Sequence, residues 1–246
     1  MHDPFYDLFP QPAEPEWIAS RVALATIDVQ YLDAHEDGWL GRVAKKQGQE
    51  ELLRPRFEAV KAILPKIRSL QEAFRASGQE VIHIRIAYRT KDGRDAGRAH
   101  MPAADVQPVP RDERDDDLLP EVPAKGDELI FSKTSAGVFN STDIDRVLRA
   151  MGIEHLVFTG IVTEGCVELS AMDAADRGYG VTIVSDATSS STPELHDAAL
   201  VRMSDGGFIA IHTTAEVLEL VTALKPASSE PGTAVVTGRR TNASKS

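Results

Sequence analysis

The amino-acid sequence predicts an α/β fold, a three-layer α/β/α sandwich in which a mostly parallel sheet lies between two layers of helices. Segments with strand character alternate with segments of helical spacing along most of the chain, as strand–helix–strand units do. Several strand segments are continuous apolar runs, which suits strands that are covered on both faces. The chain has 246 residues, 42% of them hydrophobic, which is enough for one large core.

The first half of the chain supplies two predicted strands and one long predicted helix. The run VALATIDVQ at 22–30 is the first strand, and EVIHIRIAY at 80–88 is the second. Apolar residues recur with helical spacing over 50–76, and Pro65 within this stretch predicts a kink or a division into two helices. Residues 89–127 are polar and rich in proline, which predicts a long loop.

The second half of the chain repeats the alternation of strand and helix. The predicted strands are 127–133, 155–162, 180–187 and a short strand that begins near 207; the predicted helices are 141–152, 166–178, 192–206 and a last helix that ends at 221. Parallel strands place their carboxyl ends at one edge of the sheet, where sites of such folds lie.

The two ends of the chain differ from this middle part in composition. Residues 1–20 contain several prolines and acids and predict an irregular N-terminal arm. Residues 225–246 are rich in Ser, Thr, Ala, Gly and Pro and predict a disordered tail. One domain is therefore expected over 21–224.

Charge and cysteine content narrow the classes of partner and compartment. The formal net charge is −11 and the sequence pI is about 5.1, which argues against binding to nucleic acid or to anionic membranes. The single cysteine cannot form an internal disulfide, the N-terminus lacks the features of a signal peptide, and no apolar run reaches the length of a membrane span. We expect a soluble, cytoplasmic protein.

Polar residues stand at the ends of three predicted strands. Asp28 ends the first, Lys133 ends the third, and Cys166 follows the fourth across a glycine-containing turn. If these strands are neighbours, a helix N-terminus and the Lys133 ammonium favour the Cys166 thiolate, and Asp28 is placed to accept the thiol proton. Taken singly, each residue also has a structural explanation: a small buried hydrophobe, a cap or a solvated side chain.

Three motifs resemble the isochorismatase-like cysteine hydrolases. They are IDVQ at 27–30, FSKTSAGVFNSTDIDRVLRAMGI at 131–153 and TGIVTEGCVELSAMDAADRGYGVTIVSDA at 159–187. The resemblance extends over about residues 20–221 and implies an α/β sandwich with a mostly parallel sheet. It also implies a homo-oligomer, either a dimer or a tetramer.

The same resemblance implies specific site residues. The catalytic triad of the family falls on Asp28, Lys133 and Cys166. A non-proline cis peptide bond of the family matches Ile161–Val162, and by that match the N–H groups of Val162 and Cys166 form the oxyanion hole. The segment AYRTKDGRD at 87–95 lacks the Asp-x-His metal motif of nicotinamidases, so we expect no metal and no cofactor.

The resemblance leads to a hypothesis for function. The cysteine favours hydrolysis of a linear amide or carbamoyl C–N bond in a small ureido or carbamoyl compound, through a thioester intermediate. Ureidoacrylate amidohydrolase, biuret hydrolase and N-carbamoylsarcosine amidohydrolase act in this way within the metal-free branch. The alternatives are a nicotinamidase-like or other amidase of the superfamily, or a non-catalytic member that binds small molecules or serves as a scaffold.

Side chains near the same edge of the sheet are candidates for binding a small amide or ureido substrate. These candidates are Gln30, Arg85, Tyr88, Arg89 and Phe139. An arginine would bind a carboxylate or a ureido oxygen, and the aromatic rings would line the pocket. The arginines are equally consistent with solvated loop charges, and Phe139 with a core or subunit-interface residue.

Overall fold

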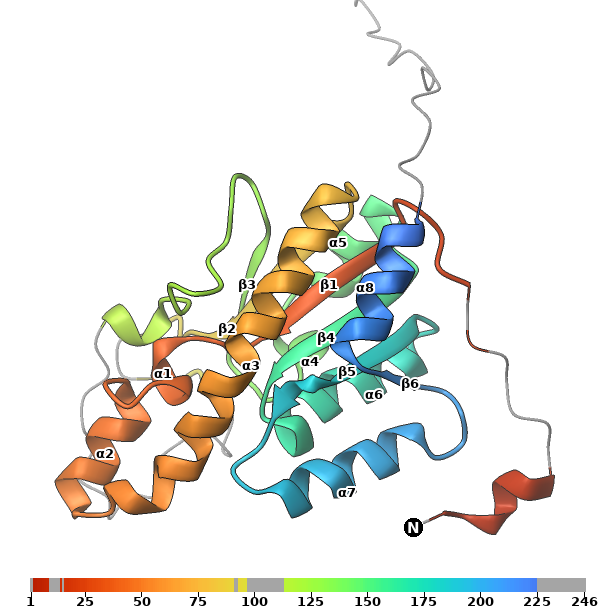
Figure 1. The fold of residues 1–246 in the computed structure, drawn as a ribbon. Helices are drawn as coiled ribbons and strands as arrows, with labels where there is room; N and C mark the ends of the chain where they lie inside the picture. Colours follow the sequence, from red (N-terminus) through yellow and green to blue (C-terminus); the bar gives the residue numbers. More distant parts are fainter. Residues whose placement is uncertain (1, 9–13, 15, 91–92, 97–112, 225–246) are drawn as a thin grey trace, which may run out of the picture.

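Six parallel strands form a single sheet in the order β3-β2-β1-β4-β5-β6 (Figure 1). The computed structural model describes residues 2–8, 14, 16–90, 93–96 and 113–224, so the predicted tail at 225–246 lies outside the described residues. The strands are β1 (Val22–Ile27), β2 (Glu80–Ile86), β3 (Ile130–Lys133), β4 (His155–Ile161), β5 (Gly180–Ser189) and β6 (Ala210–His212). Every pairing between neighbouring strands is parallel.

The strand order contains one reversal, and this reversal positions the site. From β1 the chain builds outward through β2 to β3, returns to place β4 on the other side of β1, and then builds outward through β5 to β6. The carboxyl ends of β1 and β4 therefore border the topological switch point, where ligands bind in open α/β sheets.

Helices cover both faces of this sheet. They are α1 (Tyr31–Ala34), α2 (Trp39–Gln47), α3 (Glu50–Ala76), α4 (Val138–Ser141), α5 (Ile144–Met151), α6 (Glu168–Asp176), α7 (Pro193–Ser204) and α8 (Thr214–Ala223). Buried side chains of α3 and α8 form one apolar cluster with the sheet, and those of α4 to α7 form a second cluster on the opposite face. Figure 1 shows α3 and α8 side by side over the same face. The predicted three-layer α/β/α sandwich is confirmed.

Helix α3 shows that tertiary packing can override a local helix breaker. It runs without interruption from Glu50 to Ala76 with Pro55 and Pro65 inside it, so Pro65 does not divide it into two helices; the alternative, a kink at Pro65, stays a prediction. A proline within a helix removes one hydrogen bond and costs roughly 3 kcal/mol. The apolar side of α3, from Phe57 to Phe74, is buried against the sheet, and this burial offsets the cost.

Two other segments differ from their predicted state. The first strand ends at Ile27, not at residue 30, because Asp28 adopts a left-handed backbone conformation with φ of 53°. The predicted loop at 89–127 contains the short helix η3 (Glu113–Asp116), and Leu119 and Val122 beyond it are fully buried in the core. Side chains outside the helices and strands therefore help to cover one face of the sheet.

The arm at the N-terminus is partly integrated into the domain. Residues Pro4–Leu8 form the short helix η1. Trp17 is buried, with its ring 6.4 Å from Phe74 and 5.1 Å from His155. Within the described ranges, no helix is both long enough and apolar enough to cross a membrane.

Candidate active site

The structure brings Asp28, Lys133 and Cys166 together at the carboxyl edge of the sheet. The Lys133 ammonium nitrogen Nζ lies 2.9 Å from Asp28 Oδ2 and 3.3 Å from Cys166 Sγ. It also donates to the backbone oxygen of Ser135 at 3.1 Å, so each of its three hydrogens has an acceptor. The side chains of Asp28 and Lys133 are completely buried. Residues that are distant in sequence therefore form one compact ionisable cluster.

Backbone geometry fixes Asp28 beside the second strand. Its N–H donates to the oxygen of Ile84 at 2.9 Å, just after the last parallel pair of β1. The left-handed conformation that ends the strand is one that aspartate tolerates better than most residues. This turn directs the carboxylate towards Lys133, which is the last residue of β3.

The cysteine lies in a single wide helical turn, η4 (Thr163–Val167), between β4 and α6. The Ile161–Val162 peptide bond that precedes it is cis. The Val162 oxygen accepts hydrogen bonds from Gly165 and Val167, at 3.0 and 3.3 Å, and these close the turn. The predicted helix over 166–178 is therefore shorter than expected, because α6 begins only at Glu168.

Gly160 allows the chain to enter this turn close to β1. Its φ is 108°, and a Cβ atom built on it would lie 2.1 Å from the backbone oxygen of Ile27. Any other residue would force β4 away from β1 at the point where both strands end. The close approach keeps the Cys166 turn next to Asp28.

The charges and the burial of the cluster act in opposite directions on the Cys166 thiol. Burial raises the pKa of the Cys166 thiol well above its ordinary value, the Asp28 carboxylate raises it further, and Lys133 opposes both. Burial also raises the pKa of Asp28 against the effect of Lys133. Burial lowers the pKa of Lys133, but the charge of Asp28 and the contact with Cys166 outweigh it, so this pKa is raised. Burial and the Asp28 charge thus oppose the Cys166 thiolate that Lys133 favours, and a thiolate at Cys166 stays a prediction.

The arrangement nonetheless supports thiolate formation during a reaction. Transfer of the Cys166 proton to Asp28 leaves the total charge of the cluster unchanged, since a carboxylate and a thiol become a carboxylic acid and a thiolate. No net charge has to be buried, so this transfer costs less than releasing the proton to water. Asp28 is consequently suited to act as a general base towards the thiol.

Two further residues hold the cysteine turn and were missed by sequence analysis. The buried Thr163 hydroxyl oxygen lies 2.8 Å from Nδ1 of His196, which is on α7. Burial lowers the pKa of His196, so a neutral imidazole bridges α7 and the turn. No local sequence pattern indicates this pair, because 33 positions separate the two residues.

Gln30 is occupied by structural hydrogen bonds and is not a substrate-binding residue. Its side-chain nitrogen donates to the backbone oxygens of Ile86 and Asp115, at 3.0 and 2.8 Å. Its side-chain oxygen accepts from the Ile86 N–H at 2.6 Å. With both amide hydrogens used and the residue fully buried, Gln30 fastens the end of β1 to β2 and to η3.

Arg85 lies on the face of the sheet opposite to Lys133. Ile86 is the register partner of Lys133, and successive side chains of a strand point to opposite faces. The Arg85 guanidinium donates to Ser132 Oγ at 3.1 Å and to the Asp116 backbone oxygen at 2.8 Å. It borders a separate hollow that Tyr31 also lines, so its prediction as a residue of the Cys166 site is wrong.

Phe139 belongs to the core, which was the alternative for this residue. It is buried on α4, and its ring lies 6.0 Å from that of Tyr179. The Arg177 guanidinium stacks over the same ring at 5.1 Å. These contacts engage the ring of Phe139 within the apolar cluster, and its role towards substrate stays a prediction.

Tyr88 and Arg89 follow β2 beside Lys133. The Ala87 N–H donates to the Lys133 backbone oxygen at 3.2 Å, which keeps this segment next to β3. A guanidinium nitrogen of Arg89 donates to the backbone oxygen of Ser141 at 3.3 Å. Their roles towards substrate, like the oxyanion role of the Val162 and Cys166 N–H groups, stay predictions.

Metal ligands are not grouped within the described part of the chain. There, no three or more His, Cys, Asp or Glu side chains lie in an arrangement that would hold a metal ion.

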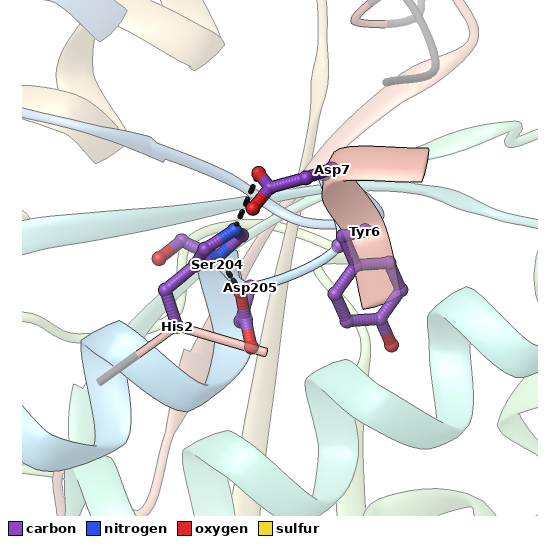
Figure 2. Close-up of a pocket in the computed structure, with 7 residues that line it drawn as sticks. His2, Tyr6, Asp7, Ser204 and Asp205 are labelled. Carbon is purple, nitrogen blue, oxygen red and sulfur yellow. Dashed lines mark hydrogen bonds and ion pairs between the residues drawn. The ribbon is translucent and has the colours of Figure 1, made fainter. Parts of the chain in front are cut away.

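A hollow outside the triad is formed by the N-terminal arm. Figure 2 shows His2 between two carboxylates, with its ring nitrogens 3.0 Å from Asp7 Oδ1 and 2.6 Å from Asp205 Oδ1. The ring of Tyr6 borders the same hollow. These contacts fasten the arm to the turn that follows α7.

A carboxylate, an ammonium and a thiol thus meet at the carboxyl edge of the parallel sheet of an α/β protein. Residues 48–220 match the isochorismatase domain. The chain therefore belongs to the isochorismatase domain family, which confirms the resemblance found in the sequence.

Individual relatives agree with this assignment. The chain is 31% identical over 206 residues to ureidoacrylate amidohydrolase RutB of Stutzerimonas stutzeri, covering 76% of this chain and 79% of the relative. The structure of a cysteine hydrolase from Pseudomonas syringae is similar with a TM-score of 0.67 and 25% identity, covering 82% of this chain and 92% of the other. N-carbamoylsarcosine amidase from Thermoplasma acidophilum shares the fold, with a TM-score of 0.58 and 20% identity over 79% of this chain and 96% of the other.

Proposed function

We propose that the protein is a cysteine-dependent amidohydrolase that cleaves the C–N bond of a small linear amide or ureido compound through a thioester intermediate. The observation that carries the proposal is the buried contact of Lys133 with both Asp28 and Cys166, at 2.9 and 3.3 Å. Similarity to proteins named ureidoacrylate amidohydrolase supports the reaction class.

In the first half of the cycle, Asp28 accepts the Cys166 proton as the sulfur attacks the carbonyl carbon. A carbon–sulfur bond forms, and the carbonyl electron pair moves to the oxygen. The N–H groups of Val162 and Cys166 are the proposed donors to this oxyanion. When the tetrahedral intermediate collapses, the C–N bond breaks and Asp28 returns its proton to the departing nitrogen.

In the second half, water hydrolyses the thioester. Asp28 accepts a proton from the water as its oxygen attacks the same carbon. The carbon–sulfur bond then breaks, and the sulfur regains a proton from Asp28. Each cycle consumes one water and releases an acid and an amine or ammonia. Lys133 remains protonated throughout, so the Asp28 carboxylate keeps its orientation in both halves.

The test is ammonia release from a panel that contains ureidoacrylate, biuret, N-carbamoyl amino acids and nicotinamide. We expect turnover of at least one ureido compound, and a loss of roughly 10³-fold or more in Cys166→Ala because the chain has no second cysteine. The melting temperature of the variant should match that of the wild type. Unchanged turnover in Cys166→Ala would refute the mechanism, and turnover of nicotinamide alone, abolished by a chelator, would favour the nicotinamidase-like alternative. Cytoplasmic location and homo-oligomerisation stay predictions.

A further inference from the structure

A buried arginine joins two segments that border the Cys166 edge. Arg56 on α3 is 9% exposed. Its guanidinium donates to Asp33 Oδ2 at 2.7 Å, to the Asp33 backbone oxygen at 2.9 Å and to Ser191 Oγ at 3.3 Å. Asp33 lies on α1, just after the Asp28 turn, and Ser191 follows β5. The arginine therefore ties α1 to the segment that follows β5.

Two oxygens in this region are buried without a hydrogen-bond partner among the described residues. They are Asp33 Oδ1 and Ser190 Oγ. Ser190 is 6% exposed. It directly follows Ser189, the register partner of Ile161, so it lies beside the start of the cysteine turn. A buried polar atom without a partner is costly, and native proteins keep such atoms mainly where a ligand or water completes them.

The carboxylate of Asp33 also acts on the reacting groups. Its negative charge contributes to raising the pKa of both Asp28 and Cys166, after the larger effect of burial. Asp33 is thus within electrostatic reach of the triad. Arg56 does not present a free cation to a substrate there, because its guanidinium is engaged by Asp33 and Ser191.

Resting on the proposed function, we propose that Asp33 and Ser190, held in place by Arg56, form a specificity subsite for N–H groups of the substrate beyond the scissile carbonyl. A carboxylate only accepts hydrogen bonds, and Ser190 Oγ accepts them too. The substrate class that satisfies both oxygens is a small, neutral ureide or amide rich in N–H groups. A substrate with a carboxylate at this position would face Asp33 and is disfavoured by charge repulsion.

A matched pair of substrates tests this subsite. N-carbamoylglycinamide and N-carbamoylglycine differ only in an amide against a carboxylate. We expect the wild type to show a kcat/KM roughly tenfold or more higher for the amide, in line with a charge-assisted hydrogen bond. Asp33→Asn should reduce this preference about tenfold, mainly by raising KM for the amide, and Ser190→Ala should raise the same KM severalfold. Asp37→Asn, which removes one exposed charge nearby, is the control and should change neither KM.

The outcomes separate this inference from the proposed function. Cys166-dependent turnover without preference for the amide, or with preference for the carboxylate, overturns the subsite and leaves the mechanism intact. Hydrolysis of neither compound by a wild type that is active on other panel members overturns the subsite as well. If Asp33→Asn fails to fold because Arg56 loses its partner, Ser190→Ala serves as the test of the subsite. The Ser190 hydroxyl has no hydrogen-bond partner in the described structure, so its removal should not destabilise the fold. An unchanged KM in Ser190→Ala then counts against the proposal.

Discussion

Replacement of Asp28 by asparagine should make the Cys166 thiol more acidic while abolishing catalysis. The substitution keeps the size of the side chain, and asparagine accepts the left-handed conformation at φ of 53° at least as well as aspartate. It removes the negative charge that raises the pKa of the thiol. The Lys133 ammonium then has Cys166 as its remaining anionic neighbour.

The size of the effect follows from the charge that is removed, because burial of the thiol and its contact with Lys133 are the same in both proteins. Lys133 Nζ lies 2.9 Å from Asp28 Oδ2 and 3.3 Å from Cys166 Sγ, so the carboxylate oxygen and the sulfur are no more than about 6 Å apart. Two unit charges at this distance repel by about 3 kcal/mol at an effective dielectric constant of about 20. The equilibrium between thiol and thiolate should therefore move towards the thiolate by roughly 100-fold.

The assay is the rate of alkylation of Cys166 by iodoacetamide as a function of pH, together with turnover of the best substrate. At neutral pH, Asp28→Asn should alkylate faster than the wild type, although its turnover falls by about 10² to 10⁴-fold through loss of the general base. Asp143→Asn, an exposed acid paired with Arg146, serves as the control and should leave the alkylation midpoint in place. A midpoint that stays the same or rises in Asp28→Asn would show that the Asp28 charge does not hold the proton on the sulfur.

Three further predictions concern the rest of the molecule. Partial burial by itself raises the pKa of Glu128, but hydrogen bonds from Arg75, the Lys125 N–H and His83 lower it from 4.5 to about 2. The stabilisation of the fold by the Glu128 carboxylate is therefore complete above pH 4.5 and is lost as the pH falls towards 2. Urea unfolding should show an acid dependence of about 2 kcal/mol that is absent in Glu128→Gln, and an identical acid profile in the variant would contradict this. Phe139→Ala should lower the free energy of unfolding by about 3–5 kcal/mol without changing KM. A changed KM with unchanged stability would instead support Phe139 as a substrate-binding residue. The carboxylates of Asp7 and Asp205 raise the pKa of His2, so docking of the N-terminal arm should be complete below pH 6.5 and weaken as the pH rises through the raised pKa. Hydrogen exchange of residues 3–8 should become faster over this pH range in the wild type. In His2→Gln, the exchange should show no such pH-dependent step.

Much of the sheet was predictable because strand and helix patterns are local. A continuous apolar run identified β1, since strands buried on both faces need apolar side chains at successive positions. Pro65 misled the prediction because helix propensity is a local property, whereas α3 is held by its contact with the sheet. The predicted end of β1 was wrong because the left-handed backbone of Asp28 ends the strand. The apolar pattern of the sequence gives no information on this backbone conformation.

The structure brings Asp28, Lys133 and Cys166 together, as their places at strand ends predict, and engages Gln30 and Arg85 in other contacts; the catalytic roles stay predictions. The convergence of Asp28, Lys133 and Cys166 follows from parallel strands sharing one carboxyl edge. Arg85 has suitable chemistry for binding an anion, but strand alternation turns it to the opposite face. Gln30 has suitable donors, but backbone oxygens of other segments use them.

The sequence by itself determined the class of fold and the edge of the sheet where Asp28, Lys133 and Cys166 meet, because both depend on residue type and on the order of elements. Only the tertiary structure decided the burial and the charged neighbours of Cys166 and the contacts of the other candidate residues. A pKa depends on burial and on charges brought from distant segments, as Asp28 and Lys133 are. Asp33 likewise meets its partner Arg56, which comes from α3, only after the chain has folded.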